Sequence, residues 1–451
     1  MSSKIGTKEM TEGPLLGSMI RYVLPVIATG VLQLLFNAAD LVVVGRFCGS
    51  NSVAAVGATG SLTVLLVNFF MGISVGGGVT VAQALGGHND QKVRETVHTA
   101  IPLAMIFGAF ISVLGICGSE FFLTLMDTPE KVLPLSALYM RIYFCGMVPH
   151  LVYNYGAAIL RAAGDTRSPL RFLTLAGVLN VCLNVFFVTV IKLDVAGVAL
   201  ATAASQALSA VLVLRALMKR EDACRFSFQE MRIRKEPLLK MLRLGIPAGI
   251  NNIMFSLANV LTQSSVNSFG DVAVAGNAAA TSIGGFVYTT MNSFHQTALN
   301  FTGQCVGAKK YDRVKRIFGL SLICVVIAGL ITGGAANLFG KPLLSIYITD
   351  SPAAVEMGMI RLRVVCLFYF LCGMQEVAVG VIRGMGASVA PMIASLFGVC
   401  VLRIGWILVV FRWLRTLQSL YFTFPLSWIV VFCIDLIILF VLFKRRRLQH
   451  D

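Results

Sequence analysis

The chain has 451 residues, of which 57% are hydrophobic and only 13% are charged, and its mean hydropathy is +0.82. Soluble domains carry about a quarter charged residues, so this composition excludes an ordinary soluble protein and indicates a multi-pass membrane protein. The net charge of +16 does not indicate a nucleic-acid partner, because Lys and Arg collect in separate loops, as the positive-inside bias predicts.

We expect no cleavable signal sequence in the polar stretch at residues 1–18, and apolar segments long enough to cross a bilayer follow it. We expect about twelve transmembrane helices, at about 19–44, 53–80, 97–118, 136–160, 170–191, 195–217, 243–268, 278–303, 317–340, 359–382, 392–411 and 423–443. The fold class is therefore all-α. We predict an N-terminal six-helix lobe (1–218), a basic cytoplasmic connection (219–242) and a C-terminal six-helix lobe with a basic cytoplasmic tail (243–451).

Loop charge predicts the orientation of these helices. Basic residues gather in "GGHNDQKVRE", "RAAGDTRSPLR", the central connection, "GAKKYDRVKR" and the tail "KRRRLQHD". The alternate loops carry few or balanced charges, apart from "RWLRT". Both termini should therefore be cytoplasmic, in the inner or plasma membrane of the cell.

The two halves of the chain resemble each other. Equivalent residues lie 222 positions apart: Arg161 and Arg383, Gly164 and Gly386, Pro169 and Pro391, Pro25 and Pro247. Because each half has an even number of helices, both halves take the same orientation, and the repeat is parallel. Two such lobes with a cleft between them are typical of transporters.

Several stretches resemble the multidrug and toxic compound extrusion (MATE) family over nearly the whole chain. They are "TEGPLLGSMIRYVLPVIATGVLQLLFNAADLVVVGR" and the paired loops "AQALGG" with "GQCVGAKK" and "RAAGDTRSP" with "RGMGASVAP". The resemblance implies an exporter driven by an inward gradient of H+ or Na+, whose typical substrates are small amphiphilic organic cations. We expect a monomer in the lipid bilayer, with no cofactor besides the coupling ion.

Asp40 is a carboxylate inside the first apolar segment, where insertion costs roughly 2.5–3.5 kcal/mol. Asn180 and Asn184 share a face of the fifth predicted helix, and Thr202 lies in the sixth. The resemblance implies that these four residues form the family's cation site, although some members have Asp where this chain has Asn184. The site suits a proton, carried by a desolvated carboxylate, or Na+, held by several oxygens. The alternative is a polar contact that fastens helices together. No other metal site is expected.

Further polar residues extend this pocket in the prediction. Gln33 and Asn37 share a helical face with Asp40, and Gln206 lies one turn beyond Thr202. Pro25 precedes Asp40 in the same segment and is a candidate hinge, with a static kink as the alternative.

In the C-terminal half, polar residues recur on one face of two predicted helices, and such a face is energetically unfavourable in contact with lipid. Candidate cleft residues there are Asn259, Gln263, Tyr288, Asn292, His295 and Gln296. Glu376 is a candidate for coupling or substrate binding, and pairing with Arg383 is its structural alternative. We assign no role to Arg403.

These features together predict a secondary antiporter that exports amphiphilic cations by rocking-type alternating access, and not an enzyme. A flippase for lipid-linked saccharides is the main alternative, and the scarcity of Lys and Arg at mid-span argues against it. An intramembrane enzyme using Asp40 and Glu376 as an acid pair lacks any supporting motif. A non-transporting scaffold would lose no function when Asp40 becomes Asn.

Overall fold

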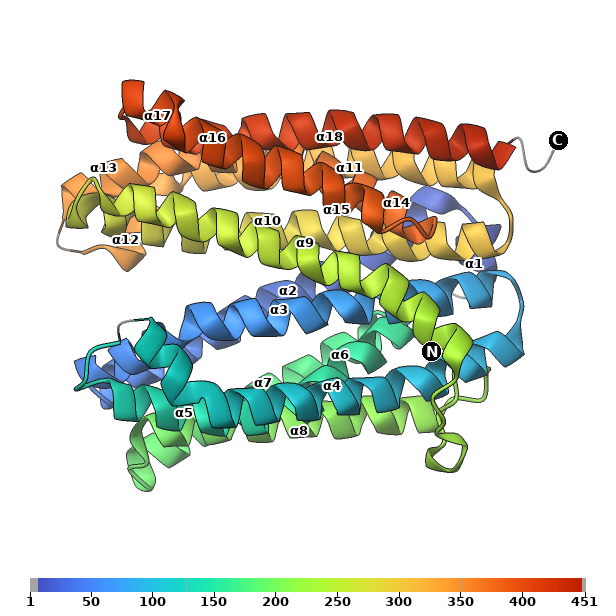
Figure 1. The fold of residues 1–451 in the computed structure, drawn as a ribbon, viewed down its shortest axis with the longest axis horizontal. Coiled ribbons are helices and arrows are strands. Elements are labelled where there is room, and N and C mark those ends of the chain that lie inside the picture. Colours follow the sequence, from blue (N-terminus) through green and yellow to red (C-terminus); the bar gives the residue numbers. More distant parts are fainter. Residues whose placement is uncertain (1–6, 127, 350, 448–451) are drawn as a thin grey trace. The chain divides into compact units, whose positions relative to one another are not determined.

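The computed structural model describes residues 7–126, 128–349 and 351–447, and this part of the chain folds into helices without strands (Figure 1). It divides into two compact units. Unit 1 comprises residues 24–249, and unit 2 comprises residues 8–23 and 250–447. The long helices α2 (Leu15–Phe47) and α9 (Lys235–Asn267) therefore each contribute to both units.

Unit 1 is built from the second part of α2, the beginning of α9 and the helices between them. These are α3 (Ser50–Gly86), α4 (Asp90–Leu125), α5 (Leu133–Cys145), α6 (Met147–Ala162), α7 (Arg167–Val185), the π-helix η1 (Phe186–Val190), α8 (Asp194–Met218) and the short 3₁₀ helix η2 (Phe228–Glu230).

Unit 2 begins with α1 (Thr7–Thr11) and the first part of α2, and continues from the second part of α9. Its other helices are α10 (Asp271–Gly307), α11 (Tyr311–Leu338), α12 (Gly340–Tyr347), α13 (Pro352–Arg361), η3 (Leu362–Cys366), α14 (Tyr369–Gly384), α15 (Val389–Ser395), η4 (Leu396–Val401), α16 (Leu402–Leu408), α17 (Val410–Trp413) and α18 (Leu417–Arg447).

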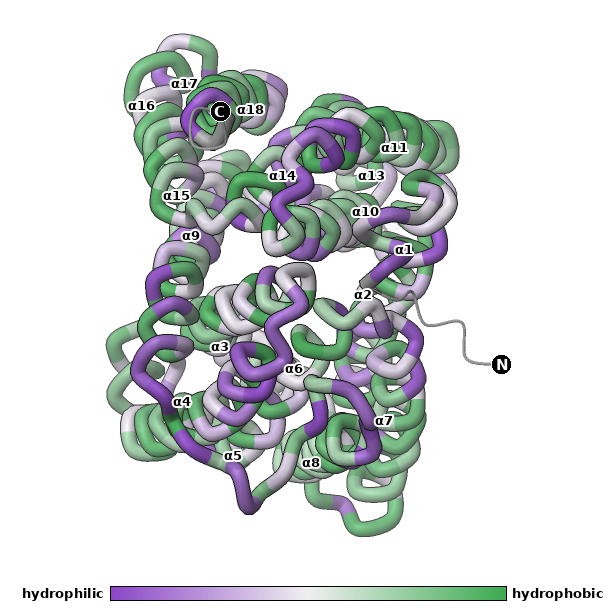
Figure 2. The backbone as a smooth tube through the Cα atoms, turned by 90° about the vertical axis from the view of Figure 1, so that its right-hand side faces the viewer, coloured by the Kyte–Doolittle hydropathy of each residue, from purple (hydrophilic) through white to green (hydrophobic). Residues whose placement is uncertain are grey.

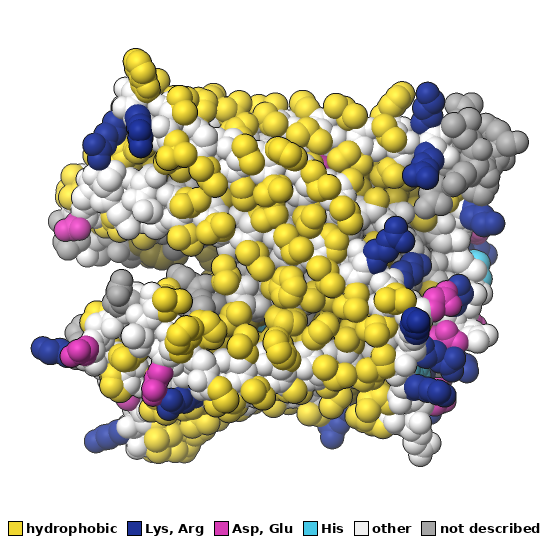
Figure 3. All heavy atoms as spheres, viewed as in Figure 1, with side chains coloured by type: hydrophobic (Ala, Val, Ile, Leu, Met, Phe, Trp, Pro, Cys, Tyr) yellow, Lys and Arg dark blue, Asp and Glu magenta, His cyan; other side chains and the backbone are white. Residues whose placement is uncertain are grey.

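The predicted all-α fold with many transmembrane helices is confirmed, and most of the twelve predicted spans are found. In the described chain, nine helices are long and apolar enough to cross a membrane, or eleven spans when two bent pairs are counted as one span each. The remaining predicted span is α10, which is 37 residues long but carries buried polar side chains such as Asn277 and Asn300. Hydrophobic side chains cover the middle of the face shown in Figure 3, and charged side chains lie toward the helix ends.

Two predicted spans, 136–160 and 359–382, are bent. The bends are 46° between α5 and α6 and 41° between the α13–η3 segment and α14. Helix α6 is preceded by Gly146 and α14 by Phe368, which are 222 positions apart. Gly164 and Gly386, after the ends of these helices, both have positive φ (82° and 90°), a conformation that favours glycine. The repeat is therefore present in the backbone as well as in the sequence.

Close packing in unit 1 depends on small residues. A Cβ at Gly76 would collide with the backbone of Met241 and Gly245 in α9, and one at Gly72 would collide with Gly249. The buried apolar core of the same unit includes Ile101, Phe144 and Tyr155, and it extends to Met241 at this contact.

The basic connection before α9 is docked on α4. The backbone N–H of Ser227 donates to His98 Nε2 (3.1 Å), so His98 is the tautomer whose Nδ1 donates to the Arg94 carbonyl (2.8 Å). Phe226 stacks on the His98 ring at 5.5 Å. The N–H of Arg234 donates to Thr99 Oγ1 (3.2 Å). Helix α9 then begins at Lys235, inside the predicted connection.

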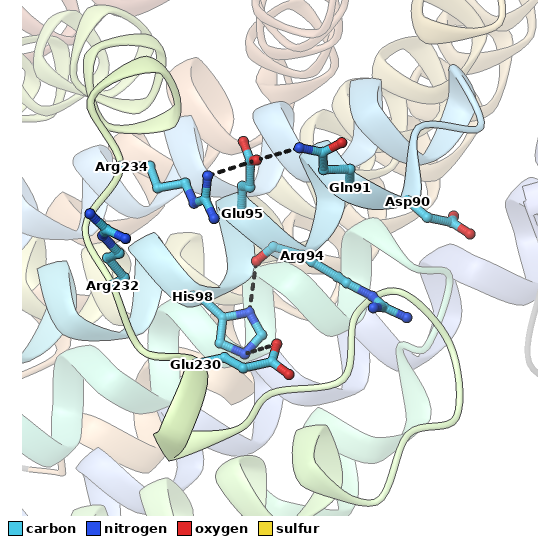
Figure 4. Close-up of a pocket in the computed structure, with 8 residues that line it drawn as sticks. All are labelled: Asp90, Gln91, Arg94, Glu95, His98, Glu230, Arg232 and Arg234. Atoms are coloured by element: carbon cyan, nitrogen blue, oxygen red, sulfur yellow. Dashed lines mark hydrogen bonds and ion pairs between the residues drawn. The ribbon is translucent and has the colours of Figure 1, made fainter.

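A charged surface cavity of about 560 Å³ lies between the beginning of α4 and this connection (Figure 4). Arg234 and Glu95 form an ion pair of 3.1 Å across it, and Glu230 Oε2 lies 3.6 Å from His98 Nε2. Figure 2 shows hydrophilic residues at this end of α4. Burial raises the pKa of the nearby Cys224 thiol to about 12, so this thiol is protonated at neutral pH.

In unit 2, the segment before α2 is held in a comparable way on the beginning of α11. The Arg313 guanidinium donates to the carbonyls of Met10 (2.9 Å), Gly13 (2.6 Å) and Glu9 (3.4 Å). Lys310 pairs with Glu12 at 2.8 Å. Thus the chain entering each of the two shared helices is fixed by hydrogen bonds to an α4 or α11 end.

Candidate ion-binding site

Helices α2, α7 and α8 bring four predicted residues of unit 1 into one hydrogen-bonded network. Asn184 Nδ2 donates to Asp40 Oδ1 and to Asn180 Oδ1, the latter at 3.3 Å. Asn180 Nδ2 in turn donates to Thr202 Oγ1 at 3.4 Å, and the Thr202 hydroxyl donates to the Val198 carbonyl at 3.0 Å. Asp40 is partly buried, and Asn180 and Asn184 are buried.

The network leaves one buried acceptor without a partner. Asn184 Oδ1 makes no hydrogen bond in the described structure, and Asp40 accepts only from Asn184. The oxygens of Asn180 and Thr202 are already engaged within the network. The free acceptors are therefore the carboxylate and one amide oxygen, a set that can take up a proton or provide the first ligands of a small cation.

Two tyrosines that sequence reasoning missed complete the surroundings of Asp40. The Tyr139 and Tyr143 rings on α5 stack at 6.1 Å, and both hydroxyls are within electrostatic reach of Asp40. Gln206 makes no hydrogen bond with the four-residue network, and its buried Oε1 has no hydrogen-bond partner in the described structure. The spacing of four residues between the tyrosines was the available signal, because it places both rings on one helical face.

An apolar cluster adjoins the carboxylate along α2. Val43 and Val44 are buried with Val188 of η1 and Val198 of α8, and Tyr139 packs against them. The π-helix η1 begins two residues after Asn184, and such local widening of a helix is frequent at functional sites. Apolar side chains near a carboxylate lower the local dielectric constant, which strengthens its electrostatic interactions.

Two predicted pocket residues lie outside this network. Gln33 and Asn37 are exposed and make no hydrogen bond with Asp40, Asn180, Asn184 or Thr202. Pro25 lies in α2 directly beside the division between the two units, which falls between Val23 and Leu24. The hinge role of Pro25 stays a prediction.

A second polar cluster lies in unit 2, around the predicted Glu376. Its Oε2 lies 3.1 Å from His295 Nδ1, and both side chains are buried. His295 Nδ1 also lies 2.8 Å from the Glu376 carbonyl. The partner of Glu376 is thus His295 of α10, whereas Arg383 acts on it from a longer distance. Asn292 accepts from Gln296 at 3.1 Å, and Tyr288 lies one turn before Asn292 in α10.

The remaining C-lobe candidates are placed differently. Gln263 accepts from Asn277 Nδ2 at 2.6 Å and donates to Asn267 at 2.9 Å, so it links α9 to α10. Asn259 is exposed. These residues therefore do not join the Glu376 cluster.

Comparisons with known proteins agree with the repeat. A sequence model of the MatE family matches residues 25–186 and 247–408, two ranges whose starts are 222 positions apart. The probable multidrug resistance protein YoeA of Bacillus subtilis is 28% identical over 87% of this chain and 86% of that protein. The FAD transporter of Shewanella oneidensis is 25% identical over 82% of each chain.

A solved structure has the same fold. It is an outward-facing multidrug resistance MATE family transporter of the MOP superfamily, with a TM-score of 0.92 and 19% identity over 99% of this chain and 100% of that one. The fold and its repeat define a multi-pass membrane transporter of two duplicated six-helix lobes. The chain belongs to the MatE family, the family of multidrug and toxic compound extrusion transporters.

Proposed function

We propose that this transporter is a secondary antiporter that exports small amphiphilic organic cations in exchange for an inward flux of H+ or Na+, and that Asp40 binds the coupling ion. The observation that carries the proposal is the network of Asp40 with Asn184, Asn180 and Thr202 inside unit 1. A partly buried carboxylate with one described hydrogen-bond donor costs free energy as long as it is charged. Taking up a proton or binding a cation neutralises that charge.

A proton is the ion that this arrangement favours. Na+ needs several oxygen ligands, whereas the Asn180 and Thr202 oxygens are occupied by hydrogen bonds within the network. A proton needs only the carboxylate. In the proposed cycle, Asp40 takes up the ion from outside while substrate leaves, and the two lobes rock between outward and inward access. The basic loops support an orientation in a cell membrane with both termini in the cytoplasm. In this proposal the protein acts as a monomer.

Inside-out vesicles with an acidic interior test this function. We expect that adding the lipophilic cation ethidium releases protons from wild-type vesicles, and that Asp40→Asn abolishes the release. The matched control is Asp271→Asn, which removes an exposed carboxylate at the beginning of α10 and should leave the release unchanged. Ethidium uptake that requires a Na+ gradient and moves no protons would keep the antiporter and replace the ion.

A separate assay tests the alternative function, a flippase for lipid-linked saccharides. Its clients carry phosphates, and the structure places Arg361 and Arg403 inside unit 2, where the sequence suggested few cationic groups. No response to ethidium under either gradient, together with movement of a fluorescent polyprenyl phosphate across proteoliposome membranes, would contradict drug export. The amphiphilic-cation proposal predicts the opposite pair of results.

A further inference from the structure

Two arginines are buried inside unit 2 without a counter-ion. Arg361 ends α13 and is 9% exposed, and Arg403 of α16 is 2% exposed. Neither forms an ion pair with any residue in the described part of the chain. Of the buried acids in unit 2, Glu376 lies against His295, and Asp435 forms no ion pair with either arginine in the described structure.

The partners that these guanidiniums do have are neutral. Arg361 Nη1 donates to Asn277 Oδ1 at 2.8 Å, and the Tyr421 hydroxyl donates to the same oxygen at 2.9 Å. Arg403 donates through Nε and Nη2 to Ser427 Oγ at 3.1 and 3.0 Å. Arg403 Nη1 is buried and has no hydrogen-bond partner.

One aromatic ring is common to both charges. The Cζ atoms of Arg361 and Arg403 lie 5.3 and 4.2 Å from the centroid of the Phe424 ring. Cation–π contact offsets only part of the free energy needed to remove a guanidinium from water. A neutral hydroxyl or amide does not neutralise the charge. Two like charges around one ring also repel each other. A bound anion would remove both penalties.

The repeat gives an independent reason to consider this place a site. At a spacing of 222 positions, Phe424 is equivalent to Thr202 of the network around Asp40, and Arg361 is equivalent to Tyr139 beside it. The position equivalent to Asp40 is Thr262, which is buried and bonds only its own helix. Unit 2 thus has guanidiniums and no carboxylate where unit 1 has its acidic site.

The backbone differs from a regular α-helix at both arginines. The π-helix η3 begins directly after Arg361, and η4 ends two residues before Arg403. Unit 1 also has a π-helix near its polar network, η1, which begins two residues after Asn184. Because π-turns are frequent at functional sites, their presence beside both arginines supports a binding role over simple helix packing.

We propose that Arg361 and Arg403 form a binding site for a small monovalent anion in unit 2, the counterpart of the cation site in unit 1. Its ligand is a halide ion or the carboxylate of a transported compound, held by charge-assisted hydrogen bonds from Arg403 Nη1 and Arg361. The inference does not depend on which ion drives transport.

Halide quenching of Trp428 tests the site directly. Trp428 lies 5.9 Å from Phe424, ring centroid to ring centroid, and the chain has three tryptophans, so Trp406→Phe with Trp413→Phe leaves Trp428 as the single reporter. We expect iodide at constant ionic strength to quench this purified protein saturably in the millimolar range. Chloride should relieve the quenching by competition.

Arginine variants then assign the site. In the Trp428 background, Arg403→Gln should abolish the saturable component, and the exposed Arg412→Gln should retain it. If Arg403→Gln does not fold, Arg361→Gln should weaken iodide binding at least tenfold. Relief by acetate as well as chloride would extend the ligand to carboxylates, and relief by chloride alone would restrict it to halides. Quenching that is absent, or linear and equal in Arg403→Gln and wild type, would overturn the proposal.

Discussion

Replacing Asn184 with Ala removes the described hydrogen-bond donor to Asp40 while leaving the carboxylate in place. Hydrogen bonds to charged groups contribute about 1.5–3 kcal/mol, and a change of 1.36 kcal/mol moves a titration by about one pH unit. The donor stabilises the charged form of Asp40. Its loss therefore favours the protonated form, and the pH dependence of transport should move upward by about one to two units.

The assay is ethidium-driven proton release from inside-out vesicles, measured at a series of internal and external pH values. The matched control is Asn37→Ala, which removes an exposed asparagine from the same helix as Asp40 without touching the network. A pH profile of Asn184→Ala that coincides with both wild type and the control would refute the reasoning. If Na+ is the ion, the same variant should instead raise the Na+ concentration required for half-maximal transport by at least tenfold.

Three further predictions concern the rest of the molecule. His295→Leu removes the His295 Nδ1 partner of the buried Glu376 carboxylate. A buried acceptor left without its donor costs about 1–3 kcal/mol, so the midpoint of thermal unfolding should fall, and by less in the double variant with Glu376→Gln. Arg313→Ala removes three hydrogen bonds to the segment before α2 and should accelerate its cleavage by a glutamate-specific protease, whereas the exposed Arg316→Ala should not. In a variant with Cys224 as its single cysteine, alkylation at pH 7.5 should be about a thousandfold slower than for a free thiol, because burial raises the pKa of Cys224 to about 12 and lowers the thiolate fraction; a rate like that of free cysteine would contradict the docked connection.

The sequence predicted the helices well where apolar runs end at charged or glycine-rich loops. The predicted segment 195–217 is α8 (Asp194–Met218), and 170–191 is α7 with η1. It did not predict the bends before α6 and α14, because a bent span and a straight one have the same apolar composition. Nor did it predict the docking of the connection on α4, which depends on contacts such as that of Ser227 with His98, 129 positions apart.

The sequence predicted all four residues of the network around Asp40, but it also predicted residues that lie outside this network. Helical spacing places Gln33 and Asn37 on the side of Asp40, yet the two are exposed while Asp40 reaches Asn184. Periodicity identifies the face of a helix and not which turn of that face meets a neighbour. For the same reason, spacing suggested Arg383 as the partner of Glu376, whereas the packing of α10 on α14 supplies His295.

Comparing the two lobes distinguishes the residues that both need in order to fold from the residues that give each lobe its own chemistry. The breaks at Gly146 and Phe368 and the positive-φ glycines recur at one spacing, because both lobes need the same helix ends and the same close packing. Interior side chains are less constrained, because each needs only neighbours of complementary shape and polarity. Position 202 is consequently Thr in a polar network, and its equivalent 424 is Phe, whose ring two guanidiniums contact. A family resemblance therefore transfers the fold to both lobes but the acidic site to one, and the chemistry of the second lobe has to be derived from its own residues.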